Sequence, residues 1–174
     1  EGLGCPVNRY HMGVTAENVA ERFGVSREDQ DELAMISHHR AVAATKNERF
    51  VKQIVEQTVP QRKGNPIAID VDEGPRENTT LEQLAQLPAV FKKGGTVTAG
   101  NASSINDGAA ALVMTSAEKA SDLGIRPRLK WHTRGIAGVE PAIMGVGPVP
   151  AVRKALNKSG MSTNDIDLIE LNEA

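Results

Sequence analysis

The sequence has few aromatic residues, a single cysteine and no long apolar run. Aromatic side chains make up 3% of the 174 residues, so a core must be built from Ala, Val, Leu and Ile. The lone cysteine excludes an internal disulfide and suits a reducing compartment. No apolar stretch approaches the roughly 18 residues that a membrane-spanning helix requires, so we expect no membrane partner.

A strong charge bias is also missing. The 20 basic and 22 acidic residues are spread along the chain, and the net charge is −2. Nucleic-acid binding needs a concentrated basic face, so we expect no nucleic-acid partner. No signal peptide is visible, and the first residue is Glu1 rather than Met. The last residue, Ala174, directly follows an apolar, strand-like run. Because of this run and of the first residue Glu1, we expect both ends to be cuts in a longer chain.

Local signals predict several elements in the first two thirds of the chain. Ser26 with Asp29 three residues on is typical of a capping box and predicts a helix to about Lys46. The run Ala109–Met114 is apolar and is expected to be buried. The other predicted elements are a helix over 16–23 opened by Thr15, strands at 54–59 and 67–71, a short helix capped by Thr79 with Glu82, and a helix capped by Thr115 with Glu118 and ended by Gly124.

The last third predicts strand–helix–strand order. We expect strands over 128–139 and 166–171, with a helix over 151–159 between them that ends at Gly160. This order indicates an α/β sheet. Residues 1–95 fit the order poorly and are interpreted as an inserted, mostly helical subdomain.

Histidines and the cysteine could carry chemistry, but each also has a structural interpretation. His11, in a Gly-rich loop, could be catalytic, ligand-contacting or structural. His38 and His39, in mid-helix, are more typical of a partly exposed helix face. His132 has no Cys or His at metal-ligand spacing, so we predict no metal site. Cys5 lies between Gly and Pro, without a neighbouring base, and is not expected to be a nucleophile.

Three further features suit ligand contacts. The run GNASSINDG, over 100–108, offers main-chain N–H groups and hydroxyls without bulk, which fits a long polar ligand or simply a loop. Asn172 ends a predicted strand, where ligands of α/β sheets gather. It could donate to an oxyanion or hold the water that does so, or be a turn Asn. Arg76, in an acidic loop, could be a phosphate ligand or an ion-pair partner.

In combination and in order, these segments resemble the thiolase family. The resemblance runs from His11 to the end of the chain and is most specific over 95–110. The motifs that carry it are HMG at 11–13, TAENVA at 15–20, SREDQD at 26–31, GTVTAGNAS at 95–103, NDGAA at 106–110, MGVGPVP at 144–150 and LNEA at 171–174.

The resemblance implies an α/β thiolase fold, present in part. Thiolases have two similar α/β halves and a loop domain inserted in the first. By resemblance, residues 1–95 are the loop domain, 96–124 the end of the N-terminal half and 125–174 the start of the C-terminal half.

The implied activity is acyl transfer, by condensing two acetyl-CoA molecules or by cleaving a 3-oxoacyl-CoA with CoA. One cysteine forms an acyl-enzyme, a second exchanges a proton, and a His and an Asn serve the oxyanion sites. CoA and its thioesters are therefore the implied substrates, and no covalently bound cofactor is implied. The run YHMG at 10–13 resembles the acetoacetyl-CoA type, and a longer-chain degradative thiolase stays open.

The resemblance also assigns site residues by position. Asn172 matches the Asn that holds the water of one oxyanion hole. The remaining matches are CoA-facing: Ser103 at the pantetheine arm, Arg76 beside the adenine nucleotide, Leu3, His11 and Ile105 in the CoA pocket, and Met12 and Met144 lining the acyl pocket. Small residues fit a flat, amide-rich arm, and methionine provides an adaptable apolar lining.

The chain departs from the family where catalysis is concerned. The two cysteine motifs and the Gly-His-Pro histidine of thiolases have no match in it, and Cys5 differs from both cysteines in neighbours and place. Gln83 stands where some relatives have a CoA-contacting serine. Without a nucleophile and base, acyl transfer has no covalent route. We therefore expect this chain alone to be inactive.

Two other interpretations stay open. The same residues could form a non-catalytic module that binds CoA or acyl-CoA. The chain could also be a structural or interaction fragment, because a severed sheet leaves edges that pair with other chains. For the parent protein, the resemblance implies a homodimer or homotetramer in the cytoplasm, or in a mitochondrion or peroxisome if the source is eukaryotic.

Overall fold

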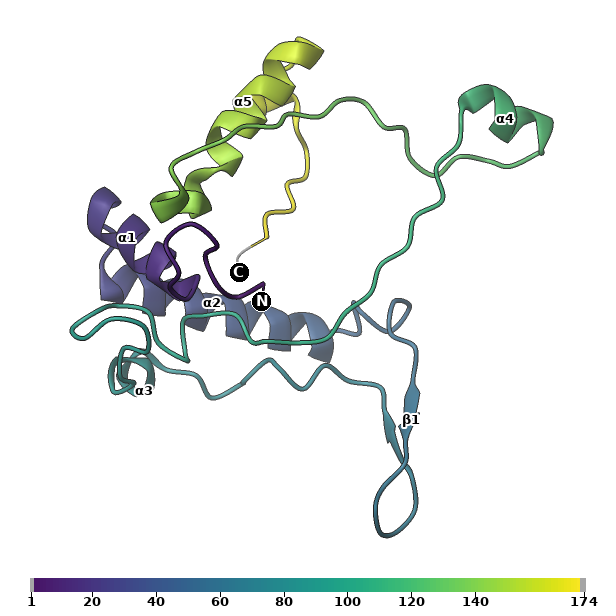
Figure 1. Cartoon of the computed structure of the whole chain (residues 1–174). Coiled ribbons are helices and arrows are strands. Elements are labelled where there is room, and N and C mark those ends of the chain that lie inside the picture. The colour runs from purple at the N-terminus through teal and green to yellow at the C-terminus, as the bar shows by residue number, and fades with distance from the viewer. Residues whose placement is uncertain (1, 173–174) are drawn as a thin grey trace. The chain divides into compact units, whose positions relative to one another are not determined.

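The computed structural model describes residues 2–172, which divide into two compact units. The first unit ends at Ser104 and the second begins at Ile105 (Figure 1). Among the described residues, every helix is too short or too polar to span a bilayer.

Two helices, α1 (Gly13–Phe23) and α2 (Arg27–Lys46), dominate the first unit. Helix α2 starts as predicted, because the Ser26 hydroxyl accepts the N–H of Asp29 while the Asp29 carboxylate accepts the N–H of Ser26. Helix α1 begins earlier than predicted. Thr15 lies inside its first turn and donates its hydroxyl to the carbonyl of Met12, so Thr15 does not cap the helix.

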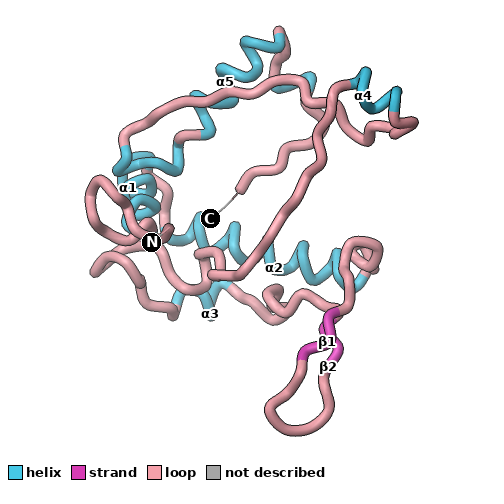
Figure 2. Tube along the Cα trace, turned by 45° about the vertical axis from the view of Figure 1, so that its right-hand side comes forward, coloured by secondary structure: helices cyan, strands magenta, loops and turns pink. Residues whose placement is uncertain are grey.

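A two-stranded antiparallel sheet follows α2. Strand β1 (Gln57–Val59) pairs with β2 (Ile67–Ile69), as Figure 2 shows. Thr58 faces Ala68 in the middle of the register. The two predicted strands are confirmed, although both are shorter than predicted. Their side chains are mostly exposed, so little apolar burial extends the pairing beyond these residues.

Two short helices start one residue later than predicted. Thr80, not Thr79, caps α3 (Leu81–Ala85), and its hydroxyl accepts the N–H of Gln83. Thr79 is unavailable because its buried hydroxyl donates to the carbonyl of Arg76. In the second unit, Ser116 rather than Thr115 caps α4 (Ala117–Asp122) by accepting the N–H of Lys119. Adjacent hydroxyl residues left the choice of cap open, because either side chain can accept the N–H at the start of the helix.

The core of the first unit is built from small side chains and contains buried polar groups. Its buried apolar residues are Cys5, Ala20, Leu84 and Val97, as the composition suggested. Its buried polar residues are Thr15, Glu17, Asp31, Thr79 and Thr98. Buried polar side chains are stable only when they are hydrogen-bonded, and the bonds of Glu17 and Asp31 join distant segments of the chain.

The second unit consists of short helices joined by extended chain. After α4 come a 3-10 helix (Pro141–Val146), α5 (Pro148–Ser159) and a 3-10 turn (Thr163–Asp165). Helix α5 begins three residues before the predicted Ala151 and ends as predicted at Gly160, whose φ of 71° is a left-handed conformation that favours glycine.

Three predictions for the second unit are wrong. The run 109–114 is not buried: Leu112 is 90% exposed and Val113 fully exposed. The predicted strands over 128–139 and 166–171 are extended chain without strand pairing. A strand is stabilised by hydrogen bonds and side chains of its neighbours, and no described segment pairs with these runs.

Candidate functional site

The N-terminal loop brings three predicted site residues together. The N–H of Met12 donates to the carbonyl of Leu3 at 2.7 Å, and Gly4 forms an antiparallel bridge with His11. Leu3 and His11 are exposed, and Met12 is half-buried. The structure thus places Leu3, His11 and Met12 on one small two-stranded loop that leads into α1.

His11 is held by an aromatic neighbour and by its own loop. Its ring stacks on Phe91 with the centroids 4.5 Å apart and the planes inclined by 18°. The Nδ1 atom accepts the N–H of Gly13 at 3.0 Å, so Nε2 carries the proton of the neutral ring. Phe91 was missed by sequence reasoning, because no local pattern links it to His11.

Arg76 lies on an exposed loop fixed against α2. Its N–H donates to Nδ1 of His38 at 3.1 Å, and its carbonyl accepts the hydroxyl of Thr79 at 3.0 Å. The neighbouring Glu77 forms an ion pair with Lys46. A cavity of about 550 Å³ opens beside this loop, lined by Met35, His39 and residues 77–83.

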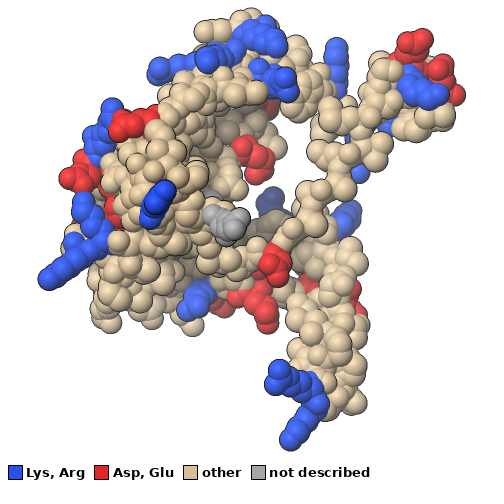
Figure 3. Space-filling model, in the orientation of Figure 1, with Lys and Arg blue, Asp and Glu red and all other residues tan. Residues whose placement is uncertain are grey.

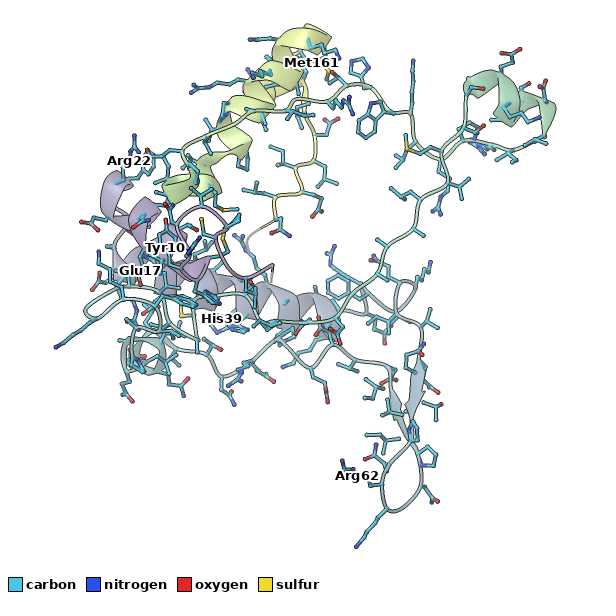
Figure 4. The ribbon with its side chains drawn as sticks, in the orientation of Figure 1. Tyr10, Glu17, Arg22, His39, Arg62 and Met161 are labelled. Carbon is cyan, nitrogen blue, oxygen red and sulfur yellow. The ribbon has the colours of Figure 1, made fainter. Side chains whose placement is uncertain are left out.

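Ser103 follows a segment that Glu17 anchors. The Glu17 carboxylate accepts the N–H of Thr96 at 2.8 Å, its hydroxyl at 3.1 Å and the N–H of Val97 at 2.9 Å. Figure 4 shows Glu17 on α1. The carboxylate is buried, and these donors compensate its lost hydration. Ser103 itself is exposed at the end of this anchored stretch.

A second buried carboxylate anchors the same segment to α2. Asp31 accepts Nε of Arg27 at 2.7 Å and Nδ2 of Asn101 at 2.9 Å. Arg27 also donates to the carbonyls of Leu84 and Leu87. Residues 96–101 are therefore fixed by both helices. Sequence reasoning missed these anchors, since their partners lie tens of residues away.

Three predicted site residues belong to the second unit. Ile105 is 80% exposed on extended chain. Met144 is in the 3-10 helix, with its side chain partly exposed and its carbonyl accepting the N–H of Gly147 at 2.9 Å. Asn172 is exposed at the end of the described chain.

Cys5 has a structural environment. It is buried, its N–H donates to the carbonyl of Tyr10 at 2.8 Å, and its sulfur accepts the N–H of Asn8 at 3.4 Å. In residues 2–172, no group of three His, Cys, Asp or Glu side chains is arranged to hold a metal ion. Acidic and basic side chains both occur on the face drawn in Figure 3.

Comparison with known proteins assigns the family. The family model described as the N-terminal domain of thiolase matches residues 1–118, and that of the C-terminal domain matches residues 125–174. The chain belongs to the thiolase family. It is 53% identical to an acetyl-CoA acetyltransferase of Pseudomonas aeruginosa over its whole length, but covers 44% of that protein. A probable acetyl-CoA acyltransferase of Staphylococcus aureus is 52% identical, also with 44% covered.

Solved structures show the same relationship for the fold. The acetyl-CoA acetyltransferase of Bacillus anthracis matches 99% of this chain with a TM-score of 0.90 and 46% identity, and 43% of that protein is covered. Human mitochondrial 3-ketoacyl-CoA thiolase in complex with CoA matches with a TM-score of 0.88 and 41% identity, over 99% of this chain and 42% of that one. The chain therefore has a partial thiolase fold and spans less than half the length of these relatives.

Proposed function

We propose that this chain is the CoA-facing part of a thiolase whose full-length form transfers acyl groups between CoA thioesters. Such an enzyme condenses two acetyl-CoA molecules or cleaves a 3-oxoacyl-CoA with CoA. The observation that carries the proposal is the match of 99% of the chain to the human thiolase in complex with CoA. The two relatives named acetyltransferases support a short acyl substrate.

In the first unit, the proposed contacts are with the arm and nucleotide of CoA. Arg76 would face the adenine nucleotide, where a guanidinium suits phosphate oxygens. Ser103 would contact the pantetheine arm, and its fixed position after the anchored segment supports a defined contact. Leu3 and His11 would complete the CoA pocket, and Met12 the acyl pocket. Their shared loop supports a common role for these three residues.

In the second unit, Ile105 would contact CoA and Met144 would line the acyl pocket. Asn172 would hold a water that donates to the thioester oxygen as negative charge develops there. An acyl-enzyme also needs a nucleophile, and Cys5 is buried with its sulfur bonded to a main-chain N–H. We therefore propose that the chain alone binds CoA without turnover.

The proposal includes organisation and assembly. Residues 1–95 would be the loop domain, 96–124 the end of the N-terminal half and 125–174 the start of the C-terminal half. The separate N- and C-terminal family matches support a boundary near residue 125. The parent would be a homodimer or homotetramer in the cytoplasm, or in a mitochondrion or peroxisome of a eukaryote.

Two measurements on the 174-residue chain test the proposal. Calorimetry should detect CoA binding that Arg76→Gln weakens, whereas Arg62→Gln, the same charge change on the exposed hairpin loop, leaves it unchanged (Figure 4). An absorbance assay with acetoacetyl-CoA should show no turnover. Absent binding would contradict the CoA-facing role. Turnover by the purified chain would contradict the predicted inactivity.

A non-catalytic CoA-binding module is the second candidate, favoured by the buried state of the single cysteine. The full-length open reading frame separates the two candidates. A parent enzyme must carry a cysteine in a Cys-Gly setting before this segment and a Gly-His-Pro segment after it. A full-length protein that binds CoA but lacks both would be a binding module.

A further inference from the structure

Two adjacent histidines on α2 bind the loop that carries Arg76. Nδ1 of His38 accepts the main-chain N–H of Arg76 at 3.1 Å. Nε2 of His39 donates to the main-chain carbonyl of Thr79 at 3.0 Å, and Figure 4 shows His39 on α2. The sequence predicted a partly exposed helix face for this pair, and His38 is half-buried and His39 exposed. Each ring also bonds a residue about 40 positions away, which the sequence did not predict.

These bonds fix the main chain of Arg76 on both sides. Its N–H is held by His38, and its carbonyl accepts the hydroxyl of Thr79, which is buried. Thr79 is held in turn by His39. The side chain of Arg76 remains exposed. A long cationic side chain is thus mounted on a fixed main chain, at the loop that borders the cavity of about 550 Å³.

The two rings use opposite hydrogen-bonding roles. His38 must offer Nδ1 as an acceptor, and His39 must offer Nε2 as a donor. One neutral tautomer, with the proton on Nε2, meets both requirements. Asparagine can replace His38 as the acceptor, since its Oδ1 lies near the place of Nδ1. Glutamine can replace His39 as the donor, since its Nε2 carries N–H groups at similar reach.

We propose that His38 and His39 are positioning residues that orient Arg76 toward the nucleotide part of CoA. The inference rests on the proposed function, in which Arg76 contacts that nucleotide. Fixing the loop before the ligand arrives reduces the ordering cost of binding. The pair acts through its bonds to the main chain of Arg76 and Thr79.

The first test measures CoA affinity of the 174-residue chain by calorimetry. His38→Ala and His39→Ala should each raise the Kd about threefold to tenfold, the effect of one hydrogen bond. His38→Asn and His39→Gln should stay within about twofold of the parent chain. Ser37→Ala, a neutral change at the exposed neighbouring position, should leave the Kd unchanged.

The second test repeats His38→Ala in an Arg76→Gln chain. If His38 acts through Arg76, it has no further effect there, because the side chain it orients is gone. General damage to the fold would weaken CoA binding in both backgrounds. Amide hydrogen exchange gives an independent readout: the Arg76 N–H should exchange faster in His38→Ala and return to the parental rate in His38→Asn.

The outcomes distinguish a failure of the inference from a failure of the proposed function. A parent chain that does not bind CoA overturns the proposed function, and the inference with it. Binding that is insensitive to Arg76→Gln overturns the proposed Arg76 contact and the inference, but leaves CoA binding by the chain standing. The inference is also overturned if Arg76→Gln weakens CoA binding but the alanine variants do not. Equally weak binding by His38→Asn and His38→Ala overturns it as well. If the alanine variants unfold, the conservative variants decide. Parental CoA affinity in His38→Asn and His39→Gln supports the inference, and a loss of affinity in these variants while they are folded overturns the inference.

Discussion

The carboxylate of Glu17 accepts the main-chain N–H of Thr96 at 2.8 Å, across 79 positions of sequence. The same carboxylate accepts the Thr96 hydroxyl and the N–H of Val97. A single side chain of α1 therefore holds the start of the stretch that ends at Ser103. Because the group is buried, these bonds are made away from competing water.

Removing this carboxylate should destabilise the first unit. Glu17→Ala leaves the N–H groups of Thr96 and Val97 without their partner, which should lower the free energy of unfolding by about 1–3 kcal/mol. Urea denaturation followed by circular dichroism measures the change. Glu21→Ala is the matched control, since its ion pair with Lys92 is exposed and should contribute little to stability. Equal effects of the two variants would contradict the assigned role of Glu17.

A negative charge at position 101 should lower the free energy of unfolding, and the size of this loss should depend on pH. Asn101→Asp brings a second carboxylate against Asp31, where Asn101 now donates at 2.9 Å. Like charges there should lower the free energy of unfolding at neutral pH by about 2 kcal/mol or more. A carboxylate facing another has a raised pKa, so the folded variant binds a proton more readily than the unfolded one. Its deficit should therefore shrink as the pH falls.

Urea denaturation of Asn101→Asp between neutral and mildly acidic pH checks this expectation. Asn106→Asp makes the same charge change at an exposed position and should show little loss at any pH. A deficit of Asn101→Asp that stays constant with pH would indicate lost packing rather than charge repulsion.

The substitution Gly135→Ala should loosen the packing of α5. An added Cβ would overlap the carbonyl oxygen of Ala151 and lie 2.8 Å from the N of Ala155. The extended chain must then move away from the helix, at a local cost of about 1–3 kcal/mol. Amide hydrogen exchange across α5 should become faster. Gly138→Ala is the control, because no atom lies near its added Cβ, and it should leave exchange unchanged.

The start of α2 should weaken in acid. Hydrogen bonds from the side chain and main chain of Ser26 lower the pKa of Asp29. A carboxyl with a depressed folded pKa contributes stability above its unfolded pKa of about 3.9, and this contribution is lost as the pH falls through the folded value. Ser26→Ala should raise the pKa of Asp29, as measured by NMR titration. Asp165, whose pKa Ser162 lowers through the same motif, should not change.

Features set by near neighbours were predictable from the sequence. The capping box of Ser26 and Asp29 and the end of α5 at Gly160 each depend on a few adjacent residues. The caps of α3 and α4 were misplaced by one residue. For α3, the Thr79 hydroxyl donates to the carbonyl of Arg76, while His39 bonds the Thr79 carbonyl, so the capping role passes to Thr80. Local pattern cannot distinguish two adjacent hydroxyls, because either one can accept the N–H that a cap satisfies.

Features set by distant partners were not predictable. The run 128–139 has strand-like composition, yet strand formation needs a neighbouring strand that the described residues do not supply. The motifs HMG and GTVTAGNAS indicated the family and its candidate site. They did not reveal that Glu17 and Asp31 anchor the second motif, or that Phe91 stacks on His11. Such contacts depend on the fold as a whole.

The exposed run at 112–114 makes the chain selectively vulnerable to proteases. Extended, exposed segments are the preferred places of cleavage. No Lys or Arg occurs between Lys93 and Lys119, so trypsin has no site there. Leu112 and Met114 instead suit a chymotrypsin-like protease, and both are largely exposed. Brief chymotrypsin treatment should therefore release the first unit with its Glu17 and His38 anchors intact, as a smaller polypeptide on which CoA binding can be examined directly.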